Sequence, residues 1–333
     1  MRKVLVLGGT GWLGHEIARQ AVADGADVTC LARGSAGGAP EGAALVRSDR
    51  TRPGAYDAVA RVDREWDEVV ELATPPDLVE GALDALAARA RHWTLVSSVS
   101  VHSRDDEPGA DESAELVAVG ERPDDAAPDL YAQQKAWAER TSAARLGDRL
   151  LVVRPSLVVG PGDPSDRFGH WPARMLRGGR VLVPTTEGRW AQVIDVADLA
   201  AWVVRAGRER LLGPVIAAAE PVPLAEVLEE ARLAAGTDPE LVPVDDAWLL
   251  EHDVRWWAGP RSLPLWLPLE ASGFARRSTA AFRAAGGTTR PLAETIRRVR
   301  DDEVTRGVGR PRRAGLTPDE EAALLRELAT QDL

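Results

Sequence analysis

The sequence is poor in tyrosine and lysine, and both scarcities point to one segment. Among 333 residues there are two tyrosines and two lysines, while every other basic residue is an arginine. Tyr131 and Lys135 supply one of each, four positions apart. Chance would place such a pair in a chain of this composition roughly once in eighty cases. A lysine retained among so many arginines indicates a task that a guanidinium performs poorly.

Other absences narrow the class of protein. The single cysteine, Cys30, excludes a disulfide within the chain and is predicted to be a small buried side chain. The net charge of −11 argues against a nucleic-acid partner. No apolar run approaches 18 residues and the chain starts directly with an apolar segment, so we expect a cytoplasmic protein without a membrane partner. The five histidines lack metal-ligand spacing, so no metal is expected.

The amino-terminal segment has the pattern of a strand, a glycine turn and a helix. The apolar run 4–7 leads into Gly8-Gly9-Thr10-Gly11-Trp12-Leu13-Gly14, and an amphipathic pattern follows. Glycines permit a tight turn and a close approach of the backbone to a pyrophosphate, which then lies at the helix N-terminus. A purely structural turn is the alternative. We predict a dinucleotide cofactor held by Gly8, Gly11, Trp12, Leu13 and Gly14.

The type of dinucleotide depends on the end of the next predicted strand, residues 27–31. An NAD site usually has a carboxylate there for the ribose 2′-hydroxyl, whereas this chain has Ala32 and then Arg33. Arg33 suits a 2′-phosphate, so we predict NADP(H), with NAD(H) less favoured. A solvated surface arginine is the alternative. Asp49, after a third strand at 44–47, either accepts from the adenine amino group or caps a turn.

Strands and helices continue to alternate along the chain. Further apolar runs at 68–73 and 93–96 read as strands, with a helical stretch at 78–91 between them. This alternation predicts an α/β fold with a Rossmann-like, doubly wound parallel sheet that binds ligands at the carboxyl ends of its strands. Ala73 and Pro155 lie at such ends and are predicted cofactor contacts.

The Tyr131/Lys135 pair carries the predicted chemistry. Residues four apart share one helix face, and a nearby cation lowers the pKa of a phenol, which can then exchange a proton with a substrate oxygen. Ser98 follows the strand 93–96, where its hydroxyl can bind the same oxygen. The acidic segment 103–128 is predicted to be a loop over the site, and Asp129 a cap of the Tyr131 helix. An accidental pair on a surface helix is the alternative.

Taken in order along the chain, these motifs resemble those of the extended short-chain dehydrogenase/reductases, the NAD(P)-dependent epimerase/dehydratase group. Besides the glycines, Ser98 and Tyr131-x-x-x-Lys135, the similar segments are Arg154–Asp163, Ile194–Ala200 and Arg290–Thr295. The resemblance implies a cofactor domain at 1–155 plus about 191–220, and a smaller substrate lobe at 156–190 plus 221–333. It also implies that Tyr131 is the acid/base, that Lys135 binds the nicotinamide ribose, that Ser98 binds the substrate oxygen, and that the protein is a monomer or a homodimer.

The sequence also departs from this group. His102 stands where many members have a tyrosine, and Gln192 lies where an arginine often binds a nucleotide-sugar phosphate. We therefore expect a smaller or more apolar carbonyl substrate, with His102, Gln192 and Arg174 of the segment 166–174 beside it. A surface role for Arg174 is the alternative. Trp248, Trp256, Trp257 and Trp266 belong either to the core or to an apolar pocket.

Two further questions stay open at the level of sequence. The amphipathic tail pattern from Glu320 to Leu328 packs either on the lobe or on a partner. The function predicted first is that of an NADP(H)-dependent oxidoreductase acting on a ketone or secondary alcohol of a small molecule. The alternatives are an epimerase or dehydratase with no net redox change, and a non-catalytic NADP(H) sensor.

Overall fold

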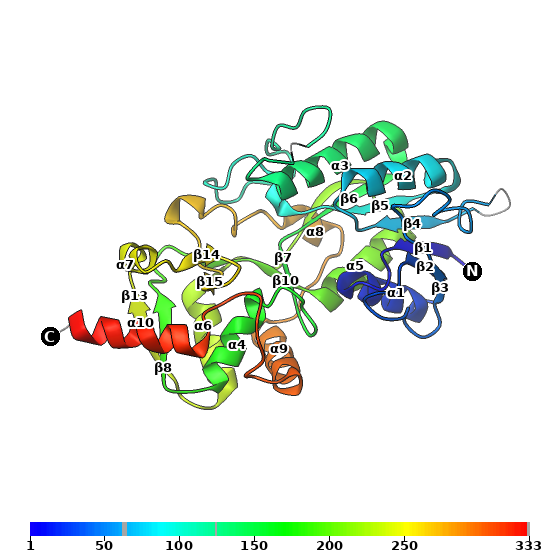
Figure 1. Cartoon of the computed structure of the whole chain (residues 1–333). Coiled ribbons are helices and arrows are strands. Elements are labelled where there is room, and N and C mark those ends of the chain that lie inside the picture. Colours follow the sequence, from blue (N-terminus) through cyan, green and yellow to red (C-terminus); the bar gives the residue numbers. More distant parts are fainter. Residues whose placement is uncertain (62–64, 124, 332–333) are drawn as a thin grey trace.

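Seven parallel strands form the central sheet of the computed structural model, which describes residues 1–61, 65–123 and 125–331 (Figure 1). Their order across the sheet is β11-β6-β5-β4-β1-β2-β3, so the chain winds outward in both directions from β1 and β4. The strands are β1 (Lys3–Leu7), β2 (Asp27–Ala32), β3 (Ala44–Arg47), β4 (Glu68–Glu71), β5 (Trp93–Val96), β6 (Leu150–Pro155) and β11 (Gly213–Ala217). The predicted Rossmann-like, doubly wound sheet is confirmed.

Helices cover both faces of this sheet (Figure 1). Helices α1 (Trp12–Ala23) and α5 (Val196–Glu209) lie on one face, and α2 (Pro76–Leu86) and α3 (Leu130–Leu146) on the other. Side chains of a strand alternate between faces, so Val4 and Val6 pack with α1 and α5 while Leu5 and Leu7 pack with α2 and α3. Strands buried on both faces explain the continuous apolar runs in the sequence.

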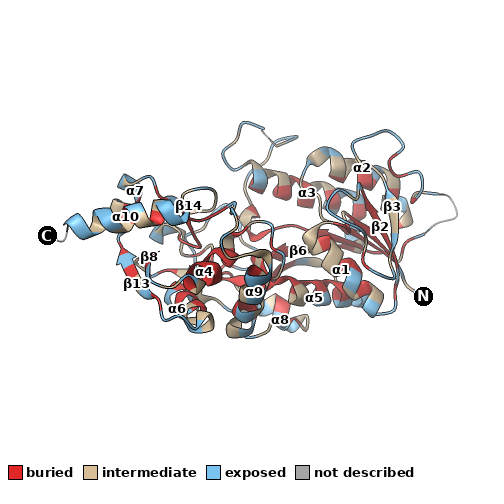
Figure 2. Cartoon of the chain, turned by 60° about the horizontal axis from the view of Figure 1, so that its bottom comes forward, coloured by how far each residue is buried: buried red, intermediate tan, exposed pale blue. Residues whose placement is uncertain are grey.

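The remaining segments form a second lobe with its own apolar core (Figures 1 and 2). Its helices are α4 (Arg167–Leu176), α6 (Leu224–Ala235), α7 (Asp246–Glu251), α9 (Leu292–Arg306) and α10 (Pro318–Gln331). Its strands pair as β8 (Arg180–Pro184) with β13 (Glu240–Val244), β9 (Trp190–Ala191) with β12 (Val222–Pro223), and β14 (Arg255–Trp257) with β15 (Ser262–Pro264). Trp171 and Trp266 are fully buried in this core.

Short elements connect the two parts. Strands β7 (Leu157–Val159) and β10 (Val193–Asp195) form a parallel pair, and α8 (Ala280–Ala284) packs against β11. The 3₁₀ turns are Ala87–Arg89, Val99–Val101, Gly147–Arg149 and Leu269–Ala271. Within the described ranges, no helix has both the length and the apolar character needed to cross a bilayer.

The C-terminal helix α10 packs on the second lobe of its own chain, which is one of the two alternatives predicted for the tail. Leu324 is buried in the core of the lobe, and the Glu321 carboxylate accepts a hydrogen bond of 3.1 Å from the backbone of Leu182 in β8. Glu321 also forms an ion pair with Arg174. The amphipathic pattern of the tail is therefore a packing pattern of this lobe.

Candidate active site

A cleft of about 480 Å³ lies between the carboxyl end of the sheet and the second lobe. The sheet side contributes Ser98 and Tyr131, and the lobe side contributes Arg167 and Trp257. Its lining is completed by Trp12, Leu13, Ser97, Val99, Ser100, Pro155, Ser156, Leu157, Val158, Asp163, Pro164, Ser165 and Phe274. We call it the Tyr131 cleft. Three predicted cofactor contacts, Trp12, Leu13 and Pro155, thus lie in its wall.

A second hollow of about 340 Å³, the glycine-turn pocket, surrounds the turn after β1. The predicted cofactor contacts among its lining residues are Gly8, Gly11, Arg33, Asp49 and Ala73. Because Gly11 lines this pocket and Trp12 lines the Tyr131 cleft, the start of α1 forms part of both walls. An elongated ligand can therefore reach from one hollow into the other along the start of this helix.

The glycine turn has the geometry of an anion cradle. Gly8 has a φ of +92°, and a Cβ built there would meet no atom within 4 Å, so the space above the turn is open. A Cβ on Gly14 would lie 2.4 Å from the Gly8 carbonyl oxygen, which shows how closely α1 approaches β1. The Gly11 cap makes no side-chain hydrogen bond and the first turn holds no acidic residue. Among the described residues no side chain caps the first N–H groups of α1, so they can donate to a pyrophosphate.

Arg33 and Asp49, which are predicted to contact the adenosine end of the dinucleotide, line this pocket. Arg33 is exposed, and its charge helps to lower the pKa of Asp49, although two hydrogen bonds from Thr51 lower it more. These bonds run from the Thr51 amide and hydroxyl to Asp49 Oδ1, at 3.1 and 2.8 Å. Asp49 therefore caps a turn, one of its two predicted roles, and still faces the pocket.

Tyr131 stands at the start of α3 with its phenol at the mouth of the cleft. Its side chain is 51% exposed and lines the open cleft. Burial raises the pKa of the phenol above its ordinary value, while a hydrogen bond with Ser98 and the charge of Arg167 lower it. The Ser98 hydroxyl is itself held by the backbone N–H of Ser100 at 3.1 Å. Tyr131 is therefore a protonated acid in the ligand-free chain.

Lys135 lies one turn further along α3 and is buried. Its ammonium donates to the carbonyl oxygens of Val96 and Ala73, at 2.8 and 3.3 Å, at the ends of β5 and β4. Burial lowers the pKa of Lys135 to about 8, against the charges of Glu71 and Glu139. In the ligand-free chain burial raises the pKa of Tyr131, and the cation that lowers it is Arg167; the tuning of Tyr131 by Lys135 stays a prediction.

The structure differs in part from two predictions, that Asp129 caps the Tyr131 helix and that the segment 103–128 is a loop over the site. Asp129 is the N-cap residue of α3, but its side chain makes no capping bond and accepts instead from Gln133 Nε2 at 2.9 Å. The segment 103–128, described except for residue 124, packs against the second lobe, with Phe274 N donating to Asp105 O at 3.0 Å. None of its described residues lines the Tyr131 cleft, so the prediction of a loop over the site is wrong.

The three predicted substrate contacts also lie away from this cleft. His102 is 4% exposed, with Nδ1 2.8 Å from the Val99 carbonyl oxygen, and burial lowers its pKa to about 4. Gln192 is buried; its side-chain amide donates to the Arg277 carbonyl oxygen and accepts from the Arg277 N–H, at 2.9 Å each. Both residues are internal braces that do not line the Tyr131 cleft, and their contact with substrate stays a prediction.

Arg174 is likewise a structural residue. It pairs with Glu321 of α10 and donates to the carbonyl oxygens of Gly178 and Arg180, at 2.9 and 2.5 Å. Its segment does reach the cleft, but through Arg167 at the opposite end of α4. Arg167 and Arg174 both belong to the segment 166–174, and the direction in which α4 runs determines which of them faces the cleft. Trp257 likewise lines the cleft, whereas Trp266 belongs to the core.

The sheet, the glycine turn and the position of the cleft define a dinucleotide-binding protein of the Rossmann type. A sequence profile of the NAD dependent epimerase/dehydratase family matches residues 4–215. The chain therefore belongs to this family. A comparison with curated proteins gives no significant match.

Solved structures with this fold include three whose sequences are distant. UDP-N-acetylglucosamine 4-epimerase from Bacillus cereus is 16% identical with a TM-score of 0.67, over 92% of this chain and 97% of that one. UDP-glucose 4-epimerase from Thermus thermophilus, solved with NAD, is 21% identical with a TM-score of 0.61, over 90% and 98%. TunA, an NAD-dependent NDP-hexosamine 5,6-dehydratase of tunicamycin biosynthesis, is 17% identical with a TM-score of 0.68, over 92% and 99%. At these identities the likeness establishes the fold.

Proposed function

We propose that the protein is an NADP(H)-dependent oxidoreductase that interconverts a ketone and a secondary alcohol of a small molecule. The observation that carries this proposal is the position of the Tyr131 phenol beside the Ser98 hydroxyl, in a cleft that adjoins the glycine-turn pocket. A proton donor and an orienting hydroxyl next to a dinucleotide site form an arrangement suited to carbonyl reduction.

The residues of the chain have distinct roles in this reaction. Ser98 donates a hydrogen bond to the substrate oxygen and orients it. A phenol is protonated at neutral pH and burial raises the pKa of Tyr131 further, so in the reducing direction it gives its proton to that oxygen. A nicotinamide cofactor, when bound, supplies the hydride for reduction or takes it up in oxidation. Lys135 has one N–H left after its two carbonyl contacts among the described residues, and we assign that donor to the cofactor ribose.

The preference for NADP(H) is part of the proposal and depends on Arg33. Its exposed guanidinium stands at the rim of the glycine-turn pocket, where a 2′-phosphate can accept charge-assisted hydrogen bonds. Asp49 lies in the same rim with its carboxylate engaged by Thr51. The two solved epimerases and the dehydratase do not decide this point for the present chain.

The deciding experiment is an incubation with NADPH and an excess of members of a carbonyl panel, with the loss of NADPH compared with the alcohol formed. The proposal requires one alcohol per NADPH consumed. An interconversion without net loss of NADPH would instead establish an epimerase or dehydratase, the second candidate, which the names of the solved relatives favour. Tight NADPH binding with no turnover of any carbonyl or alcohol would favour a sensor.

A further inference from the structure

Arg167 is a cation of the Tyr131 cleft, and within the described part of the chain no carboxylate forms an ion pair with its guanidinium. Its Nε donates to the Ser165 hydroxyl at 3.2 Å, and among the described residues no acceptor binds its two terminal nitrogens. The guanidinium carbon lies 5.3 Å from the centroid of the Trp257 ring. Burial lowers the pKa of Arg167, the direction expected of a cation that loses water without gaining a counter-ion.

Asp163 is the acidic residue among those that line the cleft, and its carboxylate binds Ser165 and not Arg167 directly. Its two carboxylate oxygens accept hydrogen bonds from the Ser165 amide and hydroxyl, at 2.8 and 2.9 Å. The charge of Asp163 reaches Arg167 only as a longer-range effect, since no ion pair within 4.0 Å joins these two described side chains. A partly buried guanidinium with free N–H groups is best satisfied by an oxyanion, which can accept two parallel hydrogen bonds.

We propose that the substrate carries an oxyanionic group, a carboxylate or a phosphate, which Arg167 binds while the reacting carbonyl lies at Ser98 and Tyr131. The carbon skeleton between the two ends lies against the rings of Trp257 and Phe274, which meet edge to face with centroids 5.4 Å apart. This inference rests on the proposed function for the position of the carbonyl. It modifies the expectation of a simply apolar substrate by adding a charge at one end.

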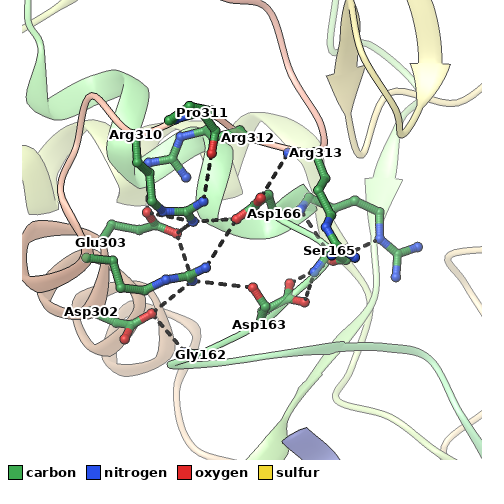
Figure 3. A network of polar contacts seen from close by, with 12 residues as sticks. Gly162, Asp163, Ser165, Asp166, Asp302, Glu303, Arg310, Pro311, Arg312 and Arg313 are labelled. Carbon is green, nitrogen blue, oxygen red and sulfur yellow. Dashed lines mark hydrogen bonds and ion pairs between the residues drawn. The ribbon is translucent and has the colours of Figure 1, made fainter. Parts of the chain in front are cut away.

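The loop that carries Arg167 is fixed from outside the cleft by a network of ion pairs (Figure 3). Asp166 has a left-handed φ of 59°, and its carboxylate pairs with Arg310 and accepts from the Arg313 backbone at 2.9 Å. Asp302 of α9 accepts from the backbone of Gly162 at 2.8 Å, at the other end of the loop. Residues 162–167 are thus held at both ends, which keeps the Arg167 side chain in one place before a ligand arrives.

The test uses matched ketones that differ only in the remote group: a carboxylate, a phosphate ester or a neutral amide. We expect the wild-type enzyme to prefer the charged members, and the better of the two identifies the oxyanion. Arg167→Gln should raise KM for the charged ketone by about 10- to 100-fold, as expected for lost charged hydrogen bonds, and leave kcat nearly unchanged. The KM for the neutral ketone should change much less than the KM for the charged one, and Arg167→Lys should restore part of the binding. Arg255→Gln, an exposed arginine on the same lobe, is the control.

The outcomes that overturn the inference are equally definite. A wild-type enzyme without preference for the charged ketones contradicts the inference. An equal loss of kcat/KM on charged and neutral ketones in Arg167→Gln also contradicts it, because Arg167 would then only support Tyr131. If no ketone is reduced at all, the proposed function fails, and the inference is then decided by binding. Titration of NADPH-loaded protein with the carboxylate compound should show binding that Arg167→Gln weakens by the same factor; absence of binding to the wild type overturns it.

Asp166 is a positioning residue in this scheme. Asp166→Asn tolerates the left-handed backbone but removes the charge that pairs with Arg310. We expect a higher KM for the charged ketone, with the affinity for NADPH and the kcat for the neutral ketone unchanged. A fall in kcat for both ketones would indicate a general loss of structure and would contradict this role.

Discussion

Tyr131 of α3 and Arg167 of α4 face the same cleft from the sheet and from the second lobe, and the Arg167 charge lowers the pKa of the Tyr131 phenol against the larger effect of burial. The pKa of the proposed catalytic acid thus includes a smaller contribution from a residue outside the nucleotide-binding part of the chain. Its protonation state in the ligand-free protein follows from enclosure more than from Lys135. Substrate and cofactor, which enclose the phenol further, can change this balance.

The first prediction concerns the hydroxyl of Tyr131. Tyr131→Phe should bind NADPH with nearly unchanged affinity and reduce turnover by about 100- to 10,000-fold, the usual contribution of a positioned acid. Steady-state rates and a fluorescence titration with NADPH measure the two effects. Tyr56→Phe is the matched control, because this second tyrosine binds Arg50 at 2.8 Å and lies outside the Tyr131 cleft. Unchanged turnover in Tyr131→Phe would remove the phenol from the mechanism.

Arg33 provides the prediction on cofactor choice. Arg33→Ser should weaken NADPH binding by about 10- to 100-fold, because charged hydrogen bonds to the 2′-phosphate are lost, and should leave NADH binding unchanged. Dissociation constants for both cofactors are compared with those of Arg19→Ser, an arginine on α1 that pairs with Glu16. A wild-type protein that binds NADH more tightly than NADPH would refute the choice before any variant is made.

Sequence alone predicted the sheet, and it singled out Tyr131 and Ser98, which line one cleft, because both features leave local signals. The strands are short apolar runs, and Tyr131 and Ser98 sit in local motifs. The contacts of the predicted substrate-binding residues depend on partners that are distant in the sequence, and local patterns do not reveal such partners. Arg174 is neutralised by Glu321, which lies 147 positions away, and Gln192 is held by the backbone of Arg277. Arg167, seven positions before Arg174, carries no signal that marks it as the one facing the cleft.

Stability should depend on pH through Glu68, which is buried at the start of β4. Burial raises its pKa from 4.5 to about 7, while the charge of Arg2 and a hydrogen bond from Thr94 lower it. The native state thus holds a proton that the unfolded state releases, so the stabilisation is complete below about pH 4.5 and is lost as pH rises through 7. The loss amounts to about 3 kcal/mol at most, from the size of the shift.

Glu68→Gln, which resembles the protonated carboxyl, should lack this decline between pH 4.5 and 7. Urea denaturation at a series of pH values measures the difference, and Glu65→Gln, on an exposed carboxylate, should retain the wild-type slope. A decline that persists in Glu68→Gln would assign it to another group. Turnover is a useful second measurement, since Glu68 lies outside the Tyr131 cleft and its substitution should leave the rate unchanged.

The last prediction concerns the attachment of α10 to the second lobe. Glu321 is buried and receives hydrogen bonds from Arg174, Arg177 and the backbone of Leu182. Glu321→Ala keeps the helix propensity of α10 but leaves the buried charge of Arg174 without its partner, a change that costs about 3–5 kcal/mol. Faster amide hydrogen exchange over residues 318–331, and a lower urea midpoint, should follow. Glu327→Ala, on a half-exposed carboxylate beside His252, should change both by little. Protected α10 amides in Glu321→Ala would show that Leu324 and its apolar neighbours hold the helix without the ion pair.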